Sequence, residues 1–202
     1  MARNTGLSQN SCRDVVAAIS ATVAVLQGKK APAPFEIRNE REALRLIAHF
    51  VGDIHQPLHV ASVYLDADGR PVDPDHDGSD PDSKTRGGND LRDGSHALHA
   101  EWDDVPTELK ADTFARNAVA EAEQVPTTPG APSGWSTTWA TDTIVVGKIA
   151  FSDVAYSAED THRQWKVTLP PGYNEMKEKL QREQLIKAGA RLAQLLTALF
   201  PQ

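Results

Sequence analysis

The chain has 202 residues, of which 40% are hydrophobic and 24% are charged, and its formal net charge is −7. This length and composition predict a single globular domain, residues 1–202, with a core of its own. The negative charge argues against a broad basic surface that would grip nucleic acid by counterion release. The single cysteine, Cys12, excludes an intrachain disulfide. No apolar run reaches the ~18 residues that a membrane span requires.

The first predicted element is a helix at Val15–Leu26, where apolar residues repeat at helical spacing. Asn10 or Ser11 is its expected N-cap. The same stretch allows a second interpretation as a signal peptide, because arginines precede it and small residues with prolines follow it at 31–34. Polar residues interrupt the apolar run, which favours an internal helix.

The central predicted helix is Glu36–His55. Pro57 disfavours helical backbone at Gln56, so the helix should end or bend there. Its expected apolar face is Leu44, Ile47, Ala48 and Val51. Its expected solvent face is Arg38, Arg41, Glu42 and Arg45.

This central helix and its bend carry a cluster of candidate metal ligands. His49 and Asp53 are four residues apart on one helix face, which is close enough to share a metal cluster. The bend at Pro57 should direct His59 toward the same place. His55 lies off the face of His49 and Asp53, and it therefore ranks lower as a ligand.

A second stretch, His99-Ala-Glu-Trp-Asp103, again places a histidine and an aspartate four residues apart. Three nitrogen or oxygen ligands with one open position are typical of a catalytic zinc site. One such pair arises often by chance. Two pairs together with His59, in a chain with 7 histidines, favour a metal site.

The remaining segments complete the predicted fold. The β-branched residues of Val60–Leu65 predict a short strand. The acidic loop at 66–82 resembles a calcium-binding loop only in part, since Lys84 occupies the position of the expected glutamate. Trp102 is expected in the core, with Glu101 and Asp104 in solvent. Further helices are expected at Glu108–Glu123, at Trp139–Tyr156 with Trp139, Ile144, Val145 and Ile149 inward, and at Tyr173–Phe200 with a split near Gly189. A loop is expected at Thr161–Tyr173.

Three motifs occur in one order along the chain: Ala48-His-Phe-Val-Gly-Asp-Ile-His-Gln-Pro-Leu-His59, Arg86-Gly-Gly-Asn89 and Leu98-His-Ala-Glu-Trp-Asp103. They resemble the S1/P1 nuclease family, and the resemblance extends from about Asn10 to the end. It implies a mainly helical fold with a small β-hairpin and a trinuclear zinc cluster. It also implies hydrolysis of single-stranded DNA, RNA and 3′-nucleotides by metal-activated water, in a secreted or periplasmic protein.

The resemblance also assigns roles to residues. His59, His99 and Asp103 would hold one zinc ion, His49 would bind a second, and Asp53 would reach the second and third. Independently of the resemblance, Gly87 and Gly88 predict a tight turn, and the side chain of Asn89 can hold it. In the family, a tryptophan, two histidines and an aspartate precede the helix at 15–26, whereas this chain has neither Trp nor His before His49. We therefore expect the chain to lack the family's first segment and to be weakly active or inactive.

Three alternatives remain open. A zinc phospholipase C shares the fold plan, although the Gln-Pro-Leu-His wording favours the nuclease. An HD-type phosphohydrolase needs an adjacent His-Asp pair on a helix, and the only such pair, His76-Asp77, lies in the acidic loop. The third alternative is an inactive protein that binds one zinc ion or none. No protein partner is evident from the sequence.

Overall fold

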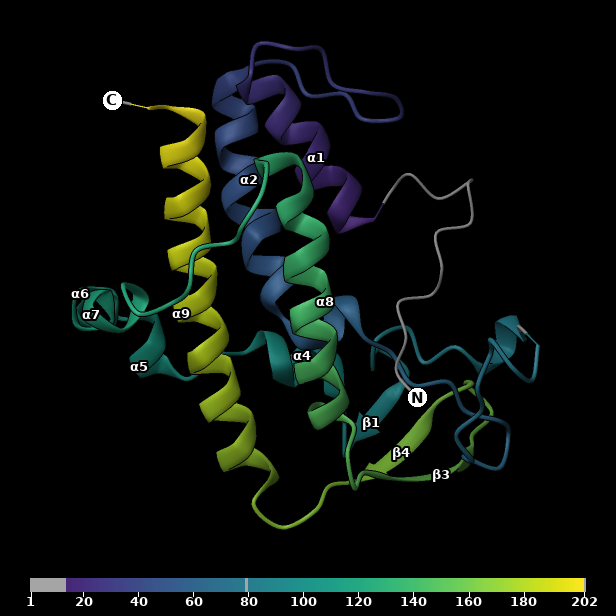
Figure 1. Ribbon diagram of the computed structural model, residues 1–202. Helices are drawn as coiled ribbons and strands as arrows, with labels where there is room; N and C mark the ends of the chain where they lie inside the picture. Colours follow the sequence, from purple (N-terminus) through teal and green to yellow (C-terminus); the bar gives the residue numbers. More distant parts are fainter. Residues whose placement is uncertain (1–13, 79, 202) are drawn as a thin grey trace. The chain divides into compact units, whose positions relative to one another are not determined.

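The computed structural model describes residues 14–78 and 80–201. These residues divide into two compact units. Unit 1 comprises the described residues within 56–110 and 143–181, and unit 2 comprises those within 14–55, 111–142 and 182–201. The long helices α8 (Pro132–Ala150) and α9 (Tyr173–Leu199) each contribute one part to both units (Figure 1).

In unit 2, helix α1 (Val15–Leu26) has the predicted bounds and packs beside α2 (Glu40–His55). Asp14 caps α1 by accepting a hydrogen bond from the Ala17 N–H at 2.8 Å. The cap is therefore neither Asn10 nor Ser11, which lie outside the described residues together with Cys12. Apolar side chains along α1 are buried, as the helical spacing predicted.

Helix α2 begins four residues later than the sequence suggested, because the side chain of Asn39 accepts a hydrogen bond from the Glu42 N–H at 2.9 Å and caps the helix there. The buried face of α2 is Ala43, Ile47, Val51, Ile54 and His55. Leu44 is 42% exposed, and Ala48 is exposed as well, so the predicted apolar face was displaced by part of a turn. The predicted solvent face lies at the surface as expected.

The helix predicted at Glu108–Glu123 is broken into three short helices. They are α5 (Thr107–Lys110), α6 (Asp112–Asn117) and α7 (Val119–Ala122). Ala111 has extended backbone dihedrals and ends the first of them, since an extended residue cannot continue the helical hydrogen-bond pattern. Helix α9, in contrast, passes Gly189 without the predicted split.

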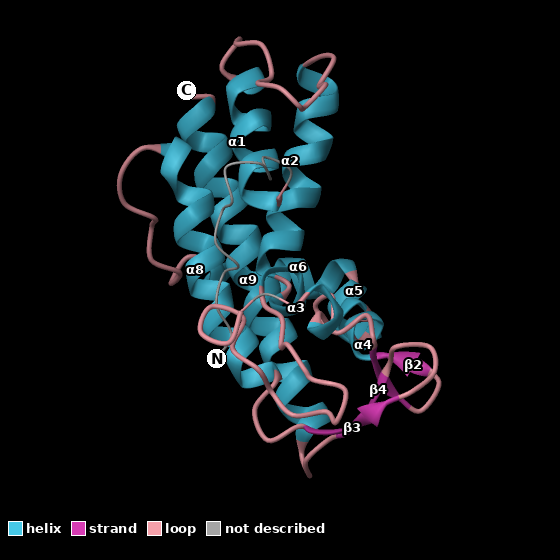
Figure 2. Ribbon diagram, turned by 90° about the vertical axis from the view of Figure 1, so that its right-hand side faces the viewer, coloured by secondary structure: helices cyan, strands magenta, loops and turns pink. Residues whose placement is uncertain are grey.

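Unit 1 contains a four-stranded sheet in the order β2-β1-β4-β3. Strands β2, β4 and β3 are labelled in Figure 2. Strand β1 (Leu91–Asp93) forms a tight antiparallel hairpin with β2 (His96–Ala97) and pairs in parallel with β4 (Trp165–Thr168). Strand β3 (Ala155–Glu159) is antiparallel to β4. The hairpin turn contains Gly94 at φ 57°, a backbone region that glycine adopts without strain.

The fold class prediction is confirmed, since helices dominate and the sheet is small, but several strand positions were wrong. Val60–Leu65 is no strand: it follows helix α3 (Pro57–Val60) and forms only isolated bridges at Tyr64 and Leu65. The expected helix at Trp139–Tyr156 begins earlier and ends at Ala150. The Ser152 N–H donates to the Ile149 carbonyl, three residues back, and Asp153 has a positive φ of 57°, so the helical pattern does not continue to Tyr156. The expected loop at Thr161–Tyr173 contains strand β4.

The core of unit 1 joins the sheet to helices α3, α4 (Leu98–Asp103), α8 and α9. Trp102 is 1% exposed, which confirms the core prediction, and its Nε1–H donates to the Tyr173 hydroxyl at 3.0 Å. That hydroxyl donates in turn to the Ala150 carbonyl at 2.8 Å. Burial raises the pKa of Tyr173 to about 12 because the phenolate would be desolvated. Trp102 thus anchors the inner face of α4.

The exposure of residues on α8 and α4 shows which of the predictions about buried and exposed side chains were right. Val145 and Ile149 on α8 are 57% and 42% exposed, so they do not point inward as predicted, whereas Trp139 is fully buried. Asp104 is exposed as expected. Glu101 is only partly exposed, and burial, together with the nearby Asp93, raises the pKa of its carboxyl group.

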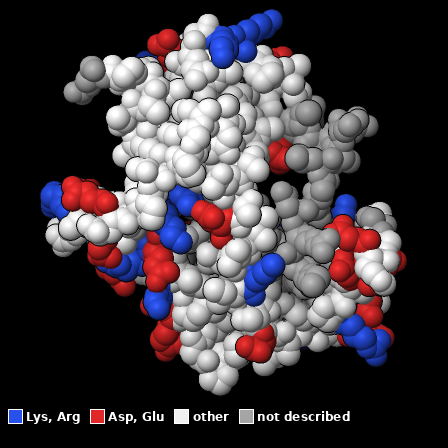
Figure 3. Space-filling model, in the orientation of Figure 1, with Lys and Arg blue, Asp and Glu red and all other residues white. Residues whose placement is uncertain are grey.

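Charged side chains are sparse on the face that α1 and the first part of α8 present in Figure 3, and α1 itself contains no charged residue. Within residues 14–78 and 80–201, no helix combines the length and the hydrophobicity that crossing a bilayer requires.

We propose that the two units belong to one domain, because α8 and α9 are continuous helices that enter both. Loss of either unit would remove packing partners from both helices. Differential scanning calorimetry should therefore show a single transition whose calorimetric and van't Hoff enthalpies agree. Two separated transitions would contradict this proposal.

Candidate metal centre

The candidate site in unit 1 is built on two short helices, α3 and α4. Gln56 has extended backbone dihedrals, and Pro57 occupies the first turn of α3, so the chain bends between His55 and Pro57 as predicted. The last part of α8 supports this bend: a Cβ on Gly147 would lie 2.3 Å from the Ala61 Cβ. Glycine at this position therefore permits the close approach that holds α3, and with it His59.

Helix α4 presents the other two side chains. His99 and Asp103 are one turn apart on its outer side, while Leu98 and Trp102 are buried on its inner side. This division follows from helical periodicity, because residues four apart share a face. The buried tryptophan fixes the helix, and the helix then sets the positions of His99 and Asp103.

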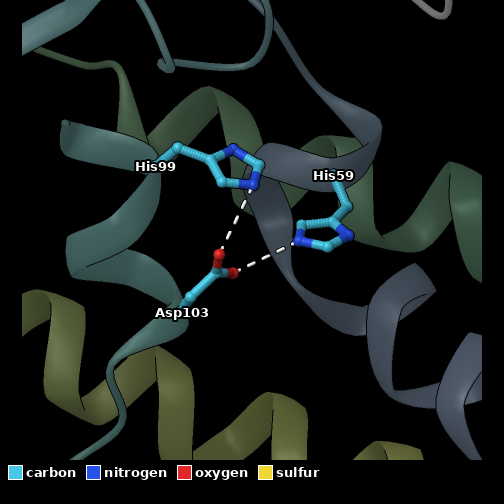
Figure 4. A group of neighbouring side chains, drawn as sticks. All are labelled: His59, His99 and Asp103. Atoms are coloured by element: carbon cyan, nitrogen blue, oxygen red, sulfur yellow. Dashed lines mark hydrogen bonds and ion pairs between the residues drawn. The ribbon is translucent and has the colours of Figure 1, made fainter.

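His59, His99 and Asp103 converge in space (Figure 4). His59 Nε2 lies 3.2 Å from Asp103 Oδ1, and His99 Nε2 lies 3.6 Å from Asp103 Oδ2. The two imidazole rings are stacked with their centroids 4.8 Å apart. Side-chain exposure is 26% for His59, 16% for His99 and 48% for Asp103, so the group is accessible from solvent.

The tautomer of His99 is set by the backbone of the glycine turn. Its Nδ1 lies 2.8 Å from the Gly87 carbonyl oxygen, which can only accept a hydrogen bond, so Nδ1 carries the proton. The lone pair of a neutral ring is then on Nε2, the atom that faces Asp103. Gly87 has φ 61°, and a Cβ there would lie 2.3 Å from the Leu58 carbonyl oxygen, so only glycine fits.

Asn89 closes the same turn. Its side-chain amide donates to the Arg86 carbonyl at 2.9 Å. The Arg86 guanidinium pairs with the mostly buried Asp90, and this pairing raises the pKa of the guanidinium. Ala97 is the N-cap of α4 and makes no side-chain hydrogen bond. The hydrogen bond of the His99 Nδ1 atom is therefore made to the Gly87 carbonyl and not to a side chain just before α4.

The chemistry of these donors fits a zinc ion. All three ligand atoms lie within 4.8 Å of one another. Ligand atoms of a tetrahedral zinc site, with bonds of about 2.0–2.1 Å, are separated by about 3.3 Å. The separations of the two histidine nitrogens from the Asp103 carboxylate, 3.2 Å to Oδ1 and 3.6 Å to Oδ2, are close to that spacing, with each nitrogen facing a different oxygen. A donor set of two imidazole nitrogens and one carboxylate is typical of zinc. The hydrogen bond from His99 Nδ1 to the Gly87 carbonyl is the kind of outer contact that orients a zinc-binding histidine.

His49 and Asp53 lie in unit 2 and form a pair of their own. His49 Nε2 is 3.2 Å from Asp53 Oδ2 across one turn of α2, with side-chain exposures of 67% and 26%. Across residues 14–78 and 80–201, the one group of three potential metal ligands is His59, His99 and Asp103. The structure thus brings three of the predicted ligands together in unit 1 and two in unit 2.

His55 is not among the grouped ligands, in agreement with its lower rank. It is 2% exposed, and its Nδ1 lies 2.7 Å from the Val51 carbonyl while its Nε2 receives a hydrogen bond from Arg191 at 3.1 Å. Both ring nitrogens are therefore engaged in the core of unit 2.

The acidic loop does not gather a calcium site among its described residues. The Asp75 N–H donates to Asp73, and the Asp73 N–H donates to Asp77, so these carboxylates bind the backbone of their own loop. His76 and Asp77 are exposed in the same loop, where an HD-type metal site has no helix to carry it. His96 and His162 are also exposed.

Sequence reasoning missed two contributors to the site, the Gly87 carbonyl and the side chain of Gln56. Gln56 Nε2 donates to Asp103 Oδ1 at 2.8 Å, and its Oε1 accepts from the Leu58 N–H. The position of Gln56 just before Pro57 was a signal for an N-cap. No local signal indicated that the cap also reaches Asp103.

A sequence model of the S1/P1 Nuclease family matches residues 2–201 of the chain. The chain belongs to the S1/P1 nuclease family. Membership supports a nuclease or phosphodiesterase activity for this family member, and the family is generally zinc-dependent and extracellular. A search of curated proteins found no match to the chain.

Proposed function

We propose that this S1/P1 nuclease-family protein is a zinc-dependent phosphodiesterase that hydrolyses single-stranded DNA, RNA and 3′-nucleotides. The observation that supports the proposal most is the convergence of His59, His99 and Asp103, with the Nε2 atoms of both histidines directed at one carboxylate. Family membership supports the reaction class. The preference for single strands is what the family resemblance implies.

Each residue of the group has a role that its geometry allows. His59 and His99 offer neutral nitrogen donors at Nε2, and Gly87 keeps the ring of His99 in that tautomer. Asp103 offers a single negative charge, so a divalent ion held here retains net positive charge. When bound, zinc supplies a Lewis acid that polarises a phosphate oxygen and lowers the pKa of water.

The net charge of −7 is compatible with this function. A positive centre in a partly exposed site would attract a phosphodiester locally, although the protein as a whole repels it. No basic surface is needed for that attraction. We expect binding to be weak and, because few phosphates are neutralised by Lys or Arg, to depend little on counterion release.

We also propose that His49 and Asp53 are zinc ligands, as the resemblance implies. Their 3.2 Å separation supports a shared ion. Two protein donors bind zinc less tightly than three, so this pair should fill only at higher zinc concentration. With a single three-ligand site, one ion would have to stabilise all the negative charge that develops in the transition state. Turnover should therefore be slower than in enzymes that use several ions.

The test is a zinc measurement and a hydrolysis assay on the same preparations. Protein purified without chelator should contain close to one zinc per chain and should cleave single-stranded DNA and RNA faster than duplex DNA. Asp103→Ala should lose both the zinc and the cleavage, whereas His162→Ala, which changes an exposed loop histidine, should keep both. Vesicles of phosphatidylcholine serve as the substrate of the phospholipase alternative. Zinc-free protein, or hydrolysis of vesicles alone, would contradict the proposal.

A further inference from the structure

Gln56 connects the two helices that carry the candidate zinc ligands. It is the N-cap of α3, where its Oε1 accepts a hydrogen bond from the Leu58 N–H. Its Nε2 donates to Asp103 Oδ1 at 2.8 Å on α4. One side chain thus terminates the helix of His59 and contacts the carboxylate of Asp103.

The orientation of the Gln56 amide follows from its two partners. The Leu58 N–H is a donor and requires the oxygen, and the Asp103 carboxylate is an acceptor and requires the NH₂ group. A flipped amide would lose both hydrogen bonds. The contact with Asp103 is therefore as well determined as the helix cap itself.

Asp103 needs such a contact because its side chain is 48% exposed. An exposed carboxylate has several rotamers, and only some direct its oxygens at His59 and His99. The hydrogen bond from Gln56 to Oδ1 restricts that rotation. The Gly87 carbonyl restricts His99 on the same helix, so each α4 ligand has an outer partner from another segment.

We propose that Gln56 is a positioning residue for the zinc site, holding the Asp103 carboxylate in register with His59. This inference rests on the proposed function, since it assumes that the three residues bind zinc. It assigns to Gln56 a role beyond capping α3. Groups that orient a metal ligand through such a hydrogen bond change metal affinity by roughly 10- to 100-fold when they are removed.

The experiment separates capping from positioning. Gln56→Ser keeps a side-chain oxygen suited to an N-cap but is too short to reach Asp103, whereas Gln56→Ala loses both interactions. The matched control is Gln164→Ser, which changes another partly buried glutamine of unit 1. The Oε1 atom of Gln164 accepts a hydrogen bond from Arg92 Nε at 2.8 Å. Zinc affinity is measured by competition with a chromophoric chelator, and thermal unfolding is measured in EDTA. The visible spectrum of the cobalt-substituted protein reports ligand geometry.

We expect Gln56→Ser to bind zinc about 10- to 100-fold more weakly than the unaltered protein and to change the cobalt spectrum, with an unchanged Tm in EDTA. Gln56→Ala should lose the same affinity and also unfold at lower temperature. Gln164→Ser should bind zinc normally.

Zinc binding by Gln56→Ser that equals that of the unaltered protein would overturn the inference while leaving the proposed function intact. Equal weakening in Gln164→Ser would also overturn it, because the effect would then be unspecific. Failure of the unaltered protein to bind zinc would overturn the proposed function, and the inference with it.

Discussion

His55 and His59 are four residues apart in one motif, yet they lie in different units and in different environments. His55 is 2% exposed in the core of unit 2, where Val51 and Arg191 engage both ring nitrogens. The side chain of His59 is 26% exposed in unit 1, and its Nε2 faces a carboxylate. A histidine binds metal only through a nitrogen whose lone pair is free, so the surroundings separate a core histidine from a candidate ligand.

The surroundings of His55 are polar as well as buried. Arg191 is 8% exposed, donates to His55, pairs with Asp142, and places its guanidinium over the ring of Trp139. Gln184 donates to the His55 carbonyl at 3.0 Å. Such a network fixes the core of unit 2 and gives His55 a structural role.

The largest contrast should appear when one histidine of each kind is replaced. His99→Ala should remove the zinc almost completely and lower the stability of the apo protein by about 1 kcal/mol, because the hydrogen bond to the Gly87 carbonyl is lost. His55→Ala should keep the zinc but lower the free energy of unfolding by about 2–3 kcal/mol, since it opens a cavity and leaves Arg191 without one partner. Zinc content and urea unfolding in EDTA measure the two effects. Zinc loss in His55→Ala would show that the two environments are not independent.

A large effect is also expected from pH. Burial lowers the pKa of His55 from 6.5 to about 4, opposed by the hydrogen bond to Val51 and assisted by the charge of Arg191. Between these values the unfolded chain binds a proton that the folded protein does not, so stability rises with pH across this window. Acidification from pH 6.5 to 4 should therefore remove about 3 kcal/mol.

Urea unfolding as a function of pH, in EDTA so that zinc release does not contribute, measures this effect. The control is His55→Gln, in which the slope between pH 4 and 6.5 should decrease. An equally steep slope in that variant would assign the acid sensitivity to other groups.

A smaller effect is expected at the glycine turn of the site. Gly87→Ala places a Cβ against the Leu58 carbonyl at a φ of 61° and should destabilise the protein by about 1–3 kcal/mol, with weaker zinc binding through His99. Gly94→Ala is the matched control, because its φ of 57° is similar but its Cβ would meet nothing within 4 Å. Equal zinc affinity in both variants would contradict the role of the Gly87 carbonyl.

The smallest effect is expected at His49. Its side chain is 67% exposed, so His49→Ala should change stability by no more than ~0.5 kcal/mol. It should abolish binding of a second zinc ion in a titration at high zinc concentration and leave the first site unchanged. A second ion that binds normally to this variant would remove His49 from the proposed ligands.

Much of the local structure was predictable from spacing. Apolar residues at helical spacing indicated α1 with its correct bounds, and Pro57 indicated the bend before α3. The positions of His99 and Asp103 on one face of α4 follow from their separation of four residues. These features depend on backbone geometry over a few residues, which neighbouring residues decide.

The sequence contains signals for strands that the prediction omits. The dipeptide Gly94-Ser95 is typical of a two-residue hairpin turn, and it lies between β1 and β2. The alternation of buried and exposed residues in Trp165–Thr168 is typical of a strand. The β-branched run at Val60–Leu65 predicts a strand, but it forms only isolated bridges at Tyr64 and Leu65.

The helical class, the family motifs and the two His-x-x-x-Asp pairs can be read from the chain alone, because each depends on residue type and short spacing. The contacts of His59 with His99 and Asp103, of Gln56 with Asp103, and of Arg191 with His55 depend instead on how distant segments pack. Packing also leaves Val145 and Ile149 exposed on α8, a helix whose two ends differ from the prediction as well. Contacts between residues 40 to 140 positions apart depend on how elements pack, and periodicity within one element carries no information about its partner.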